Sequence, residues 1–303
     1  MIKLPPYLKK GQTIGITCPA GYMDAKKAQT CINTLQGWGF EVMLGKTLGS
    51  RSKNYFSGTD EERRDELQAM LDDDNIHAIL FGRGGYGVGR IIDQLDFTKF
   101  RKQPKWLIGF SDITVLHCHL NTRYKIASMH APMAAAFNDG GYKNEYIDSL
   151  HKAILGKKAK YNCTVHSFNT TGTVNAELVG GNLSLLAHLC GTASALNSSN
   201  KILFIEDIGE YIYNYDRLLY QLKRNGNLDH LAGLIVGGFT DSKDTERTFG
   251  KKVYAVIKDI VAEYDYPVCF GFPVSHEKEN YALKIGVHYK LTVNKKNVWL
   301  TEL

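Results

Sequence analysis

The stretch HAILFGRGGYGVGRIIDQLDF, residues 77–97, reads as a short buried strand, a glycine-rich turn and a helix. The stretch KWLIGFSDITVLHCHLNTRY, residues 105–124, repeats that order. Earlier in the chain, strand patterns at 13–20 and 40–45 alternate with helix patterns, and the helix pattern at 59–75 opens with a capping box. This alternation predicts βαβ units and a parallel sheet covered by helices on both faces.

The alternation stops after about residue 140. A loop at 134–146 leads into a short helix, and the following stretch is rich in β-branched and turn residues. We therefore expect an N-terminal α/β domain at 1–150, a linker at 151–170 and a second domain at 171–303. Strand patterns in the second domain lie at 201–207, 231–239, 267–273 and, as a closing hairpin, 289–303; helix patterns lie at 182–192, 214–226 and 252–264.

Composition restricts the classes of function. The 303 residues are 44% hydrophobic and 22% charged, which is ordinary for a protein with a sizeable core. The net charge of +6 is spread along the chain, so a nucleic-acid surface, which needs clustered Lys and Arg, is not expected. A small anionic substrate fits the same charge.

The cysteines and the chain start indicate a cellular compartment. Six cysteines lie far apart without a C-x-x-C pair, so neither a disulfide framework nor a metal knuckle is expected. The first residues do not form a signal peptide, and no apolar run approaches the ~18 to 20 residues of a membrane span. We expect a cytoplasmic protein with no membrane partner and no metal.

The glycine-rich turn GRGGYGVGR, residues 82–90, is the first candidate for chemistry. Five glycines after a strand expose backbone N–H groups that can hold an anion, and they indicate that something approaches the backbone closely. Gly82, Gly84 and Gly87 match the spacing G-x-G-x-x-G, but a dinucleotide site needs its glycine turn after the first strand, where this chain has CPAGYM.

Ser111 stands where a buried strand ends and a helix begins. One interpretation is an N-cap, since serine is favoured there. The other is a nucleophile on a sharp strand-to-helix turn, with the Asp112 backbone N–H available to stabilise an oxyanion. The G-x-S-x-G pattern of α/β-hydrolases is not met, because Ile113 replaces its last glycine.

A serine nucleophile needs a base and a group that orients the base. Glu206 and Asp207 follow the apolar strand KILFI, and His276 lies in the loop GFPVSHEKEN after another strand. Carboxylates at a strand end are commonly edge residues, and a single loop histidine is commonly solvated, so these positions alone leave the role open. No His, Asp and Glu set has the spacing of metal ligands.

Taken together, the motifs resemble the serine LD-carboxypeptidases, a family that includes muramoyltetrapeptide carboxypeptidases and, as a branch, microcin-immunity peptidases. The resemblance runs over essentially the whole chain, with seven motifs in family order: GRGGYG, IGFSDITVLH, HAPM, LVGGNLSLLAHLCGT, FIEDIGE, YDRLLYQL and GFPVSH. It implies a Rossmann- or flavodoxin-like N-terminal domain and a C-terminal domain with a β-barrel-like core and flanking helices. It also implies a homodimer without cofactor or metal.

The resemblance assigns roles to the candidates. Ser111 is expected to be the nucleophile, His276 the general base and Glu206 the residue that orients His276, with the site between the two domains. The backbone N–H groups of Asp112 and Gly85 are expected to form the oxyanion hole. Beside them, Arg83 and Gly84 are expected to bind the substrate, with Arg83 recognising its terminal carboxylate; a plain surface arginine is the alternative.

The expected reaction is release of the terminal D-alanine from a murein tetrapeptide, a small peptide of the cell wall. Alanine stands at position 131, where the family frequently has glycine. No tryptophan lies between residues 140 and 200, so the tryptophan-bearing insertion of the microcin-immunity branch is lacking. This lack favours murein tetrapeptides over microcin-like peptidyl nucleotides. Besides that microcin-type peptidase, the alternative is a non-catalytic protein that holds a phosphate or nucleotide on the glycine turn.

Overall fold

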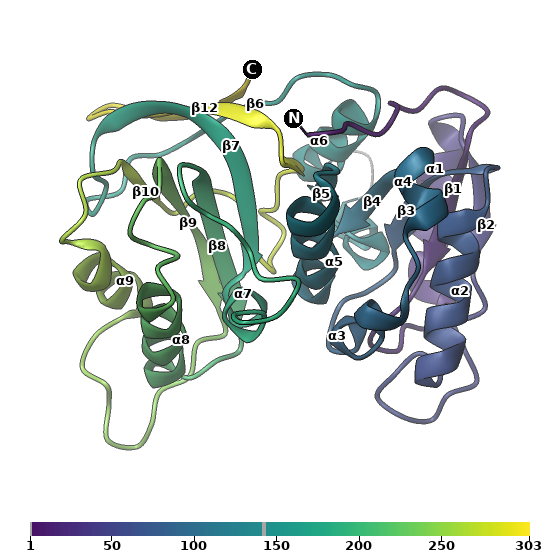
Figure 1. Ribbon diagram of the computed structural model, residues 1–303, viewed down its shortest axis with the longest axis horizontal. Coiled ribbons are helices and arrows are strands. Elements are labelled where there is room, and N and C mark those ends of the chain that lie inside the picture. Colours follow the sequence, from purple (N-terminus) through teal and green to yellow (C-terminus); the bar gives the residue numbers. More distant parts are fainter. Residues whose placement is uncertain (1, 141–143) are drawn as a thin grey trace. The chain divides into compact units, whose positions relative to one another are not determined.

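The computed structural model describes residues 2–140 and 144–303, so residues 141–143 of the predicted 134–146 loop lie outside the described residues. The chain forms two compact units (Figure 1). Unit 1 comprises residues 1–157 and 281–284, and unit 2 comprises residues 158–280 and 285–303. None of the helices within the described ranges combines the length and apolar character needed to cross a membrane.

Unit 1 is built on a six-stranded sheet with the order β11-β5-β4-β3-β1-β2. The pairs β1–β2, β1–β3, β3–β4 and β4–β5 are parallel, which confirms the predicted parallel sheet. Its strands are β1 Thr13–Thr17, β2 Glu41–Leu44, β3 Ile76–Phe81, β4 Trp106–Gly109, β5 Ser128–His130 and β11 Leu283–Ile285.

The helices of unit 1 follow the predicted alternation but are more broken. They are α1 Gln29–Gly37, α2 Asp60–Asp72, α3 Val88–Ile91, α4 Thr98–Lys102, α5 Thr114–His119 and α6 Glu145–Ile154. The capping box of α2 is present, with Thr59 and Glu62 bonded reciprocally. The helix predicted from 88 to 97 ends early, at Ile91, and continues only as a 3₁₀ turn.

Unit 2 carries a seven-stranded mixed sheet with the order β10-β9-β8-β7-β12-β13-β6. The strands β7 to β10 pair in parallel, whereas β7, β12, β13 and β6 pair in antiparallel fashion. The strands are β6 Lys160–Cys163, β7 Gly172–Asn182, β8 Ile202–Ile208, β9 Gly233–Thr240, β10 Val268–Phe270, β12 His288–Val293 and β13 Val298–Glu302. Three helices accompany them: α7 Leu183–His188, α8 Ile212–Arg224 and α9 Val253–Val261.

This second sheet curls toward closure. The strands β6 and β10 stand at opposite ends of the sheet order, yet the sulfur atoms of Cys163 and Cys269 on these strands lie 3.8 Å apart. An antiparallel bridge between Thr170 and Val268 joins the segment after β6 to β10, and the long strand β7 is visibly bent (Figure 1). The expected barrel-like core of the second domain is confirmed.

One short strand was not predicted. β11 belongs to a segment near the C-terminus, and it forms the edge of the sheet of unit 1 beside β5. The buried Lys284 fixes this segment by donating from Nζ to the carbonyl oxygen of Lys157 at 3.2 Å. A three-residue strand that pairs with a partner about half the chain away leaves little local pattern to read.

Candidate active site

Ser111 sits on a strained turn. The chain leaves β4 at Gly109, passes Phe110 in extended conformation, and reaches Ser111 with φ of +63°. Residues with a side chain rarely adopt this left-handed region, because the Cβ atom then crowds the backbone. No side chain caps the 3₁₀ turn Ser111–Ile113, so the interpretation of Ser111 as an N-cap is wrong. A strained serine at a strand-to-helix turn is the geometry of a nucleophile elbow.

The glycine-rich turn after β3 lies directly against this serine. A Cβ atom placed on Gly84 would be 2.8 Å from the Cβ of Ser111, 2.9 Å from its Oγ and 3.2 Å from the backbone nitrogen of Asp112. Only glycine fits so close to the hydroxyl. The neighbouring strands β3 and β4 are parallel, so their carboxyl ends bring the two turns to one edge of the sheet.

The peptide between Gly84 and Gly85 has a defined orientation. The carbonyl oxygen of Gly84 accepts a hydrogen bond of 3.0 Å from the Gly21 N–H. All described peptide bonds are trans, so the N–H of Gly85 points away from Gly21. Gly85 itself has φ of +98°, and a Cβ there would lie 2.9 Å from the Tyr55 hydroxyl. Tyr55 was not predicted as a site residue, because a single exposed aromatic residue in a loop has no distinctive sequence pattern.

Glu206 and His276 form an ion-pair geometry in unit 2. The Nδ1 atom of His276 lies 2.6 Å from Oε2 of Glu206, and the Glu206 side chain is 0% exposed. The glutamate lies in the buried part of β8, near its carboxyl end, and the histidine follows β10 in the loop 271–276. β8, β9 and β10 are parallel neighbours, so their carboxyl ends share one edge.

Two glycines of β9 bring the histidine loop to the glutamate. The register between β8 and β9 shifts opposite Glu206, where Gly237 and Gly238 supply the extra residue of a bulge. A Cβ on Gly237 would lie 2.2 Å from the Val274 carbonyl oxygen, and one on Gly238 would lie 2.5 Å from the Ser275 Cβ. The Gly238 N–H donates to the Val274 carbonyl oxygen at 2.9 Å. The bare backbone of β9 therefore seats the residues just before His276.

Comparison with known proteins adds to this geometry. Residues 14–131 match the model of the LD-carboxypeptidase N-terminal domain, and residues 175–291 match that of the LD-carboxypeptidase C-terminal domain. A protein of Bacillus subtilis named probable murein peptide carboxypeptidase is 36% identical over 93% of this chain and 89% of its own length.

The chain belongs to the LD-carboxypeptidase family.

It is a serine-type carboxypeptidase, a hydrolase. The alternative prediction of a non-catalytic binding protein is therefore wrong. The crystal structure of muramoyltetrapeptide carboxypeptidase from Oxalobacter formigenes has a TM-score of 0.87 and 28% identity, covering 96% of this chain and 98% of that one. The Microcin C7 self-immunity protein MccF of Escherichia coli is 27% identical over 97% of this chain and 94% of its own. Both branches of the family are therefore among its relatives.

The surroundings of His276 in the candidate site change its pKa. Burial of the His276 imidazole disfavours its charged form, but the charge and hydrogen bond of Glu206, with a contribution from Asp207, outweigh that effect and raise the pKa of His276 above its ordinary 6.5. An imidazole held in this way is oriented by its Nδ1 atom and is a stronger base at Nε2.

The two acidic residues near the end of β8, Glu206 and Asp207, make different contacts. Asp207 accepts hydrogen bonds from the Asn182 side chain at 2.7 Å and from the backbone and hydroxyl of Ser184 at 2.9 and 2.7 Å, so it holds the start of α7. Burial raises the pKa of Asp207 to about 6, with the Glu206 charge adding to the shift. Asp207 therefore supports the fold, while Glu206 contacts the histidine.

The other predicted residues lie in unit 1. Arg83 is exposed, and its Nη1 donates to the Tyr22 carbonyl oxygen at 2.9 Å, which fixes the guanidinium beside the glycine turn. Arg83, Gly84, Gly85, Ser111 and Asp112 thus lie in unit 1, whereas Glu206 and His276 lie in unit 2. Among the described residues, no group of His, Cys, Asp or Glu side chains gathers in a way that could hold a metal ion.

A histidine that was not predicted as a site residue, His117, stabilises the backbone before the serine turn. His117 on α5 is fully buried, with Nε2 2.8 Å from the Gly109 carbonyl oxygen and Nδ1 2.8 Å from the Ser128 hydroxyl. Burial lowers the pKa of His117 to about 4, so the ring is neutral and donates from one nitrogen only. It ties the ends of β4 and β5 together beneath Ser111.

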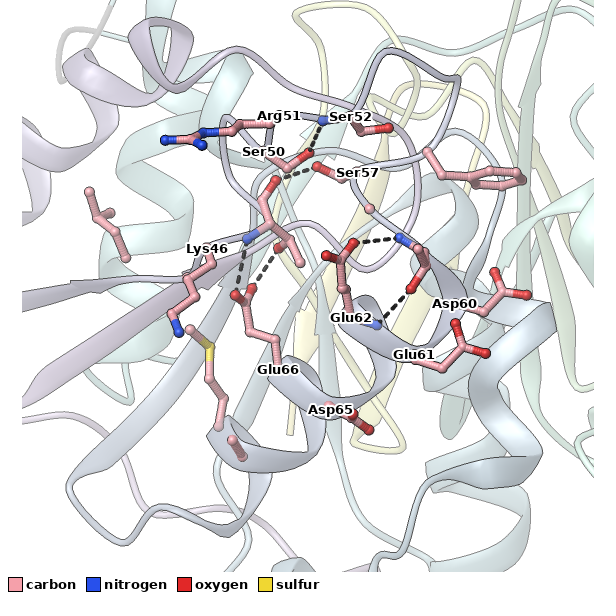
Figure 2. Close-up of a pocket in the computed structure, with 18 of the residues that line it drawn as sticks. Lys46, Ser50, Arg51, Ser52, Ser57, Asp60, Glu61, Glu62, Asp65 and Glu66 are labelled. Carbon is pink, nitrogen blue, oxygen red and sulfur yellow. Dashed lines mark hydrogen bonds between the residues drawn. The ribbon is translucent and has the colours of Figure 1, made fainter.

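A separate hollow of about 1410 Å³ lies in unit 1 between β2, the loop after it and α2 (Figure 2). None of the predicted site residues lines it. Its central carboxylates are already engaged: Glu66 accepts from the Thr47 backbone at 3.0 Å, and Glu62 closes the capping box with Thr59 (Figure 2). These hydrogen bonds stabilise the walls of the hollow, which contains none of the residues of the serine turn.

Proposed function

We propose that this enzyme releases the terminal D-alanine from murein tetrapeptides by cleaving an L,D-peptide bond with Ser111, His276 and Glu206. The observation that carries the proposal is the pair of half-sites: a serine at φ of +63° against a glycine turn, and a buried glutamate 2.6 Å from a loop histidine. The substrate class comes from the names of the relatives, which act on murein peptides.

The proposed reaction begins at the serine. Ser111 Oγ attacks the carbonyl carbon before the terminal D-alanine, while His276 Nε2 takes the hydroxyl proton. The tetrahedral oxyanion is held by the N–H groups of Asp112 and Gly85. His276 then gives its proton to the leaving D-alanine nitrogen, which leaves an ester on Ser111. Water, deprotonated by His276, attacks that ester and restores the serine. This scheme requires the serine of unit 1 to meet the histidine of unit 2.

Arg83 and Gly84 complete the proposal. A carboxypeptidase must recognise a terminal carboxylate, and a guanidinium beside the oxyanion donors offers paired N–H groups for it. Arg83 is held there by one bond to the Tyr22 carbonyl oxygen. Gly84 leaves room for the substrate chain beside the hydroxyl, because any side chain at that position would fill the same space.

Peptidyl-nucleotide hydrolysis is the second candidate, since the similarity to the Microcin C7 self-immunity protein extends over 97% of this chain. The absence of tryptophan between residues 140 and 200 favours murein peptides. The proposal also places the enzyme in the cytoplasm, as a homodimer that works without cofactor or metal.

The test is D-alanine release from a purified tetrapeptide, measured by mass spectrometry beside turnover of an aminoacyl sulfamoyl adenosine. We expect Ser111→Ala to lose at least about 10⁴-fold in kcat, and His276→Ala to lose a similar factor. The exposed Ser199→Ala is the matched control and is expected to match the wild type. Wild-type release of D-alanine by Ser111→Ala would overturn the assignment. Turnover of the nucleotide alone would favour the second candidate.

A further inference from the structure

The Asp112 carboxylate bridges two turns that are remote in the sequence. Its Oδ2 accepts a hydrogen bond of 2.8 Å from the backbone N–H of Val88, in the peptide group that joins Gly87 to the first residue of α3. Gly87 ends the glycine turn, and Asp112 directly follows the nucleophile. A single side chain therefore joins the glycine turn to the serine turn.

The same glycine is held from its other side by a buried guanidinium. Arg63 of α2 is 0% exposed, and its Nη1 donates to the carbonyl oxygens of Gly87 at 3.2 Å and Pro19 at 2.6 Å. A Cβ on Gly87 would lie 2.7 Å from that Nη1 atom. The peptide group between Gly87 and Val88 is thus held at its N–H by a carboxylate and at its carbonyl by a cation, which leaves this end of the turn little freedom.

Burying a carboxylate destabilises the folded state unless the protein compensates the charge. Asp112 is 1% exposed, and burial raises its pKa to about 6, against the opposing effects of the nearby Val88 and Gly87 backbone N–H groups and of Arg63. Arg63 is the charged side chain that faces it from α2, while the glycine turn and α3 present backbone N–H groups to it. Oδ1 has no hydrogen-bond partner among the residues that the structure describes. Simple packing would be served better by an apolar side chain.

We propose that Asp112 is a positioning residue whose carboxylate sets the separation of the two oxyanion donors. One donor is the N–H of Asp112 itself, and the other, that of Gly85, lies three residues before Val88, whose N–H the carboxylate holds. The inference rests on the proposed function, because it assumes that these N–H groups stabilise an oxyanion at Ser111. Without the carboxylate, the glycine turn loses its attachment to the serine turn, and the donors no longer converge on one oxygen.

The experiment compares Asp112→Ala and Asp112→Asn with the wild type, using D-alanine release from tetrapeptide. An asparagine oxygen can accept the Val88 N–H, so we expect Asp112→Asn to stay within about tenfold of wild-type kcat. We expect Asp112→Ala to lose about 10²- to 10³-fold in kcat with KM nearly unchanged, the loss typical of one oxyanion donor. The exposed Asp93→Asn is the matched control and should behave as wild type.

The split between kcat and KM and the rescue by asparagine separate positioning from plain structural support. A positioning carboxylate acts on the transition state, so its loss should lower kcat and leave KM nearly unchanged. Asparagine keeps the acceptor oxygen and should restore most of kcat. If Asp112→Ala folds poorly, kcat of the folded Asp112→Asn still tests the proposal.

Two outcomes would overturn the inference. One is kcat of a folded Asp112→Ala within threefold of wild type, and the other is a loss of about 10²-fold or more in kcat of a folded Asp112→Asn. Either result, obtained while Ser111→Ala is inactive on the same peptide, refutes the role of Asp112 and leaves the proposed function standing. An active Ser111→Ala instead refutes the proposed function itself.

Discussion

Replacing Gly237 by alanine should damage catalysis from a residue that takes no part in the chemistry. The new Cβ would lie 2.2 Å from the Val274 carbonyl oxygen and 3.2 Å from the Glu206 Cβ. Both the strand and the carbonyl are backbone, so the contact cannot be relieved by a side-chain rotation. Reaching 3.4 Å, the lower edge of ordinary contact, requires the loop to move by about 1.2 Å. That loop carries His276 two residues later.

A displacement of about 1 Å at a catalytic base costs on the order of 10²-fold in rate. We therefore expect Gly237→Ala to lower kcat about 100-fold, and overpacking to lower the free energy of unfolding by about 1–3 kcal/mol. The assay is D-alanine release at saturating tetrapeptide, with urea unfolding measured in parallel.

The control for this substitution is Gly37→Ala. Gly37 lies at the end of α1, where an added Cβ meets nothing within 4 Å, so this variant should retain wild-type kcat. A folded Gly237→Ala enzyme with kcat within threefold of wild type would refute the reasoning that the bare backbone of β9 seats the histidine loop.

Three further predictions follow from the same geometry. The proposed base, His276, must be neutral to accept a proton and its pKa is raised, so the acid limb of kcat/KM should have its midpoint above pH 6.5. Glu206→Gln removes the negative charge beside His276, so this variant should have a lower midpoint and a kcat lower by about 10³-fold. An unchanged midpoint would contradict Glu206 as the cause of the raised pKa. Ser111→Gly should unfold with about 1 kcal/mol more free energy than Ser111→Ala, since only glycine relieves φ of +63°; equal unfolding curves would count against strain at that turn. His117→Ala should lose about 3–5 kcal/mol in urea unfolding, because it leaves a cavity and two buried partners without a hydrogen bond, and a loss below about 1 kcal/mol would disprove its anchoring role.

Much of the fold could be predicted from local pattern. Short apolar runs followed by glycine or by helix-favouring residues identify β1, β3 and β4, because a parallel strand buried on both faces has to be apolar throughout. The capping box at Thr59 and Glu62 marks the start of α2, since these groups satisfy the first N–H donors of any helix. Such signals act over a few residues and survive without tertiary context.

The failures have the opposite character. β11 pairs with a sheet whose other strands come from the first half of the chain, and the helix after the glycine turn ends at Ile91 and gives way to a 3₁₀ turn. The interpretation of Ser111 as an N-cap was wrong. Serine at a strand-to-helix turn looks the same in the sequence whether its φ is ordinary or left-handed, so only the structure could show the difference.

For the site, the sequence by itself was enough to select the candidate side chains and to predict that they lie at or just after the carboxyl ends of strands. Only the tertiary structure decided that Glu206 and not Asp207 faces His276, that Gly84 touches Ser111, and that the Asp112 carboxylate holds the glycine turn. The physical reason is that direction and distance depend on a bulge in β9, on the register of parallel strands and on burial. Each of these arises from contacts between segments that are far apart in the chain.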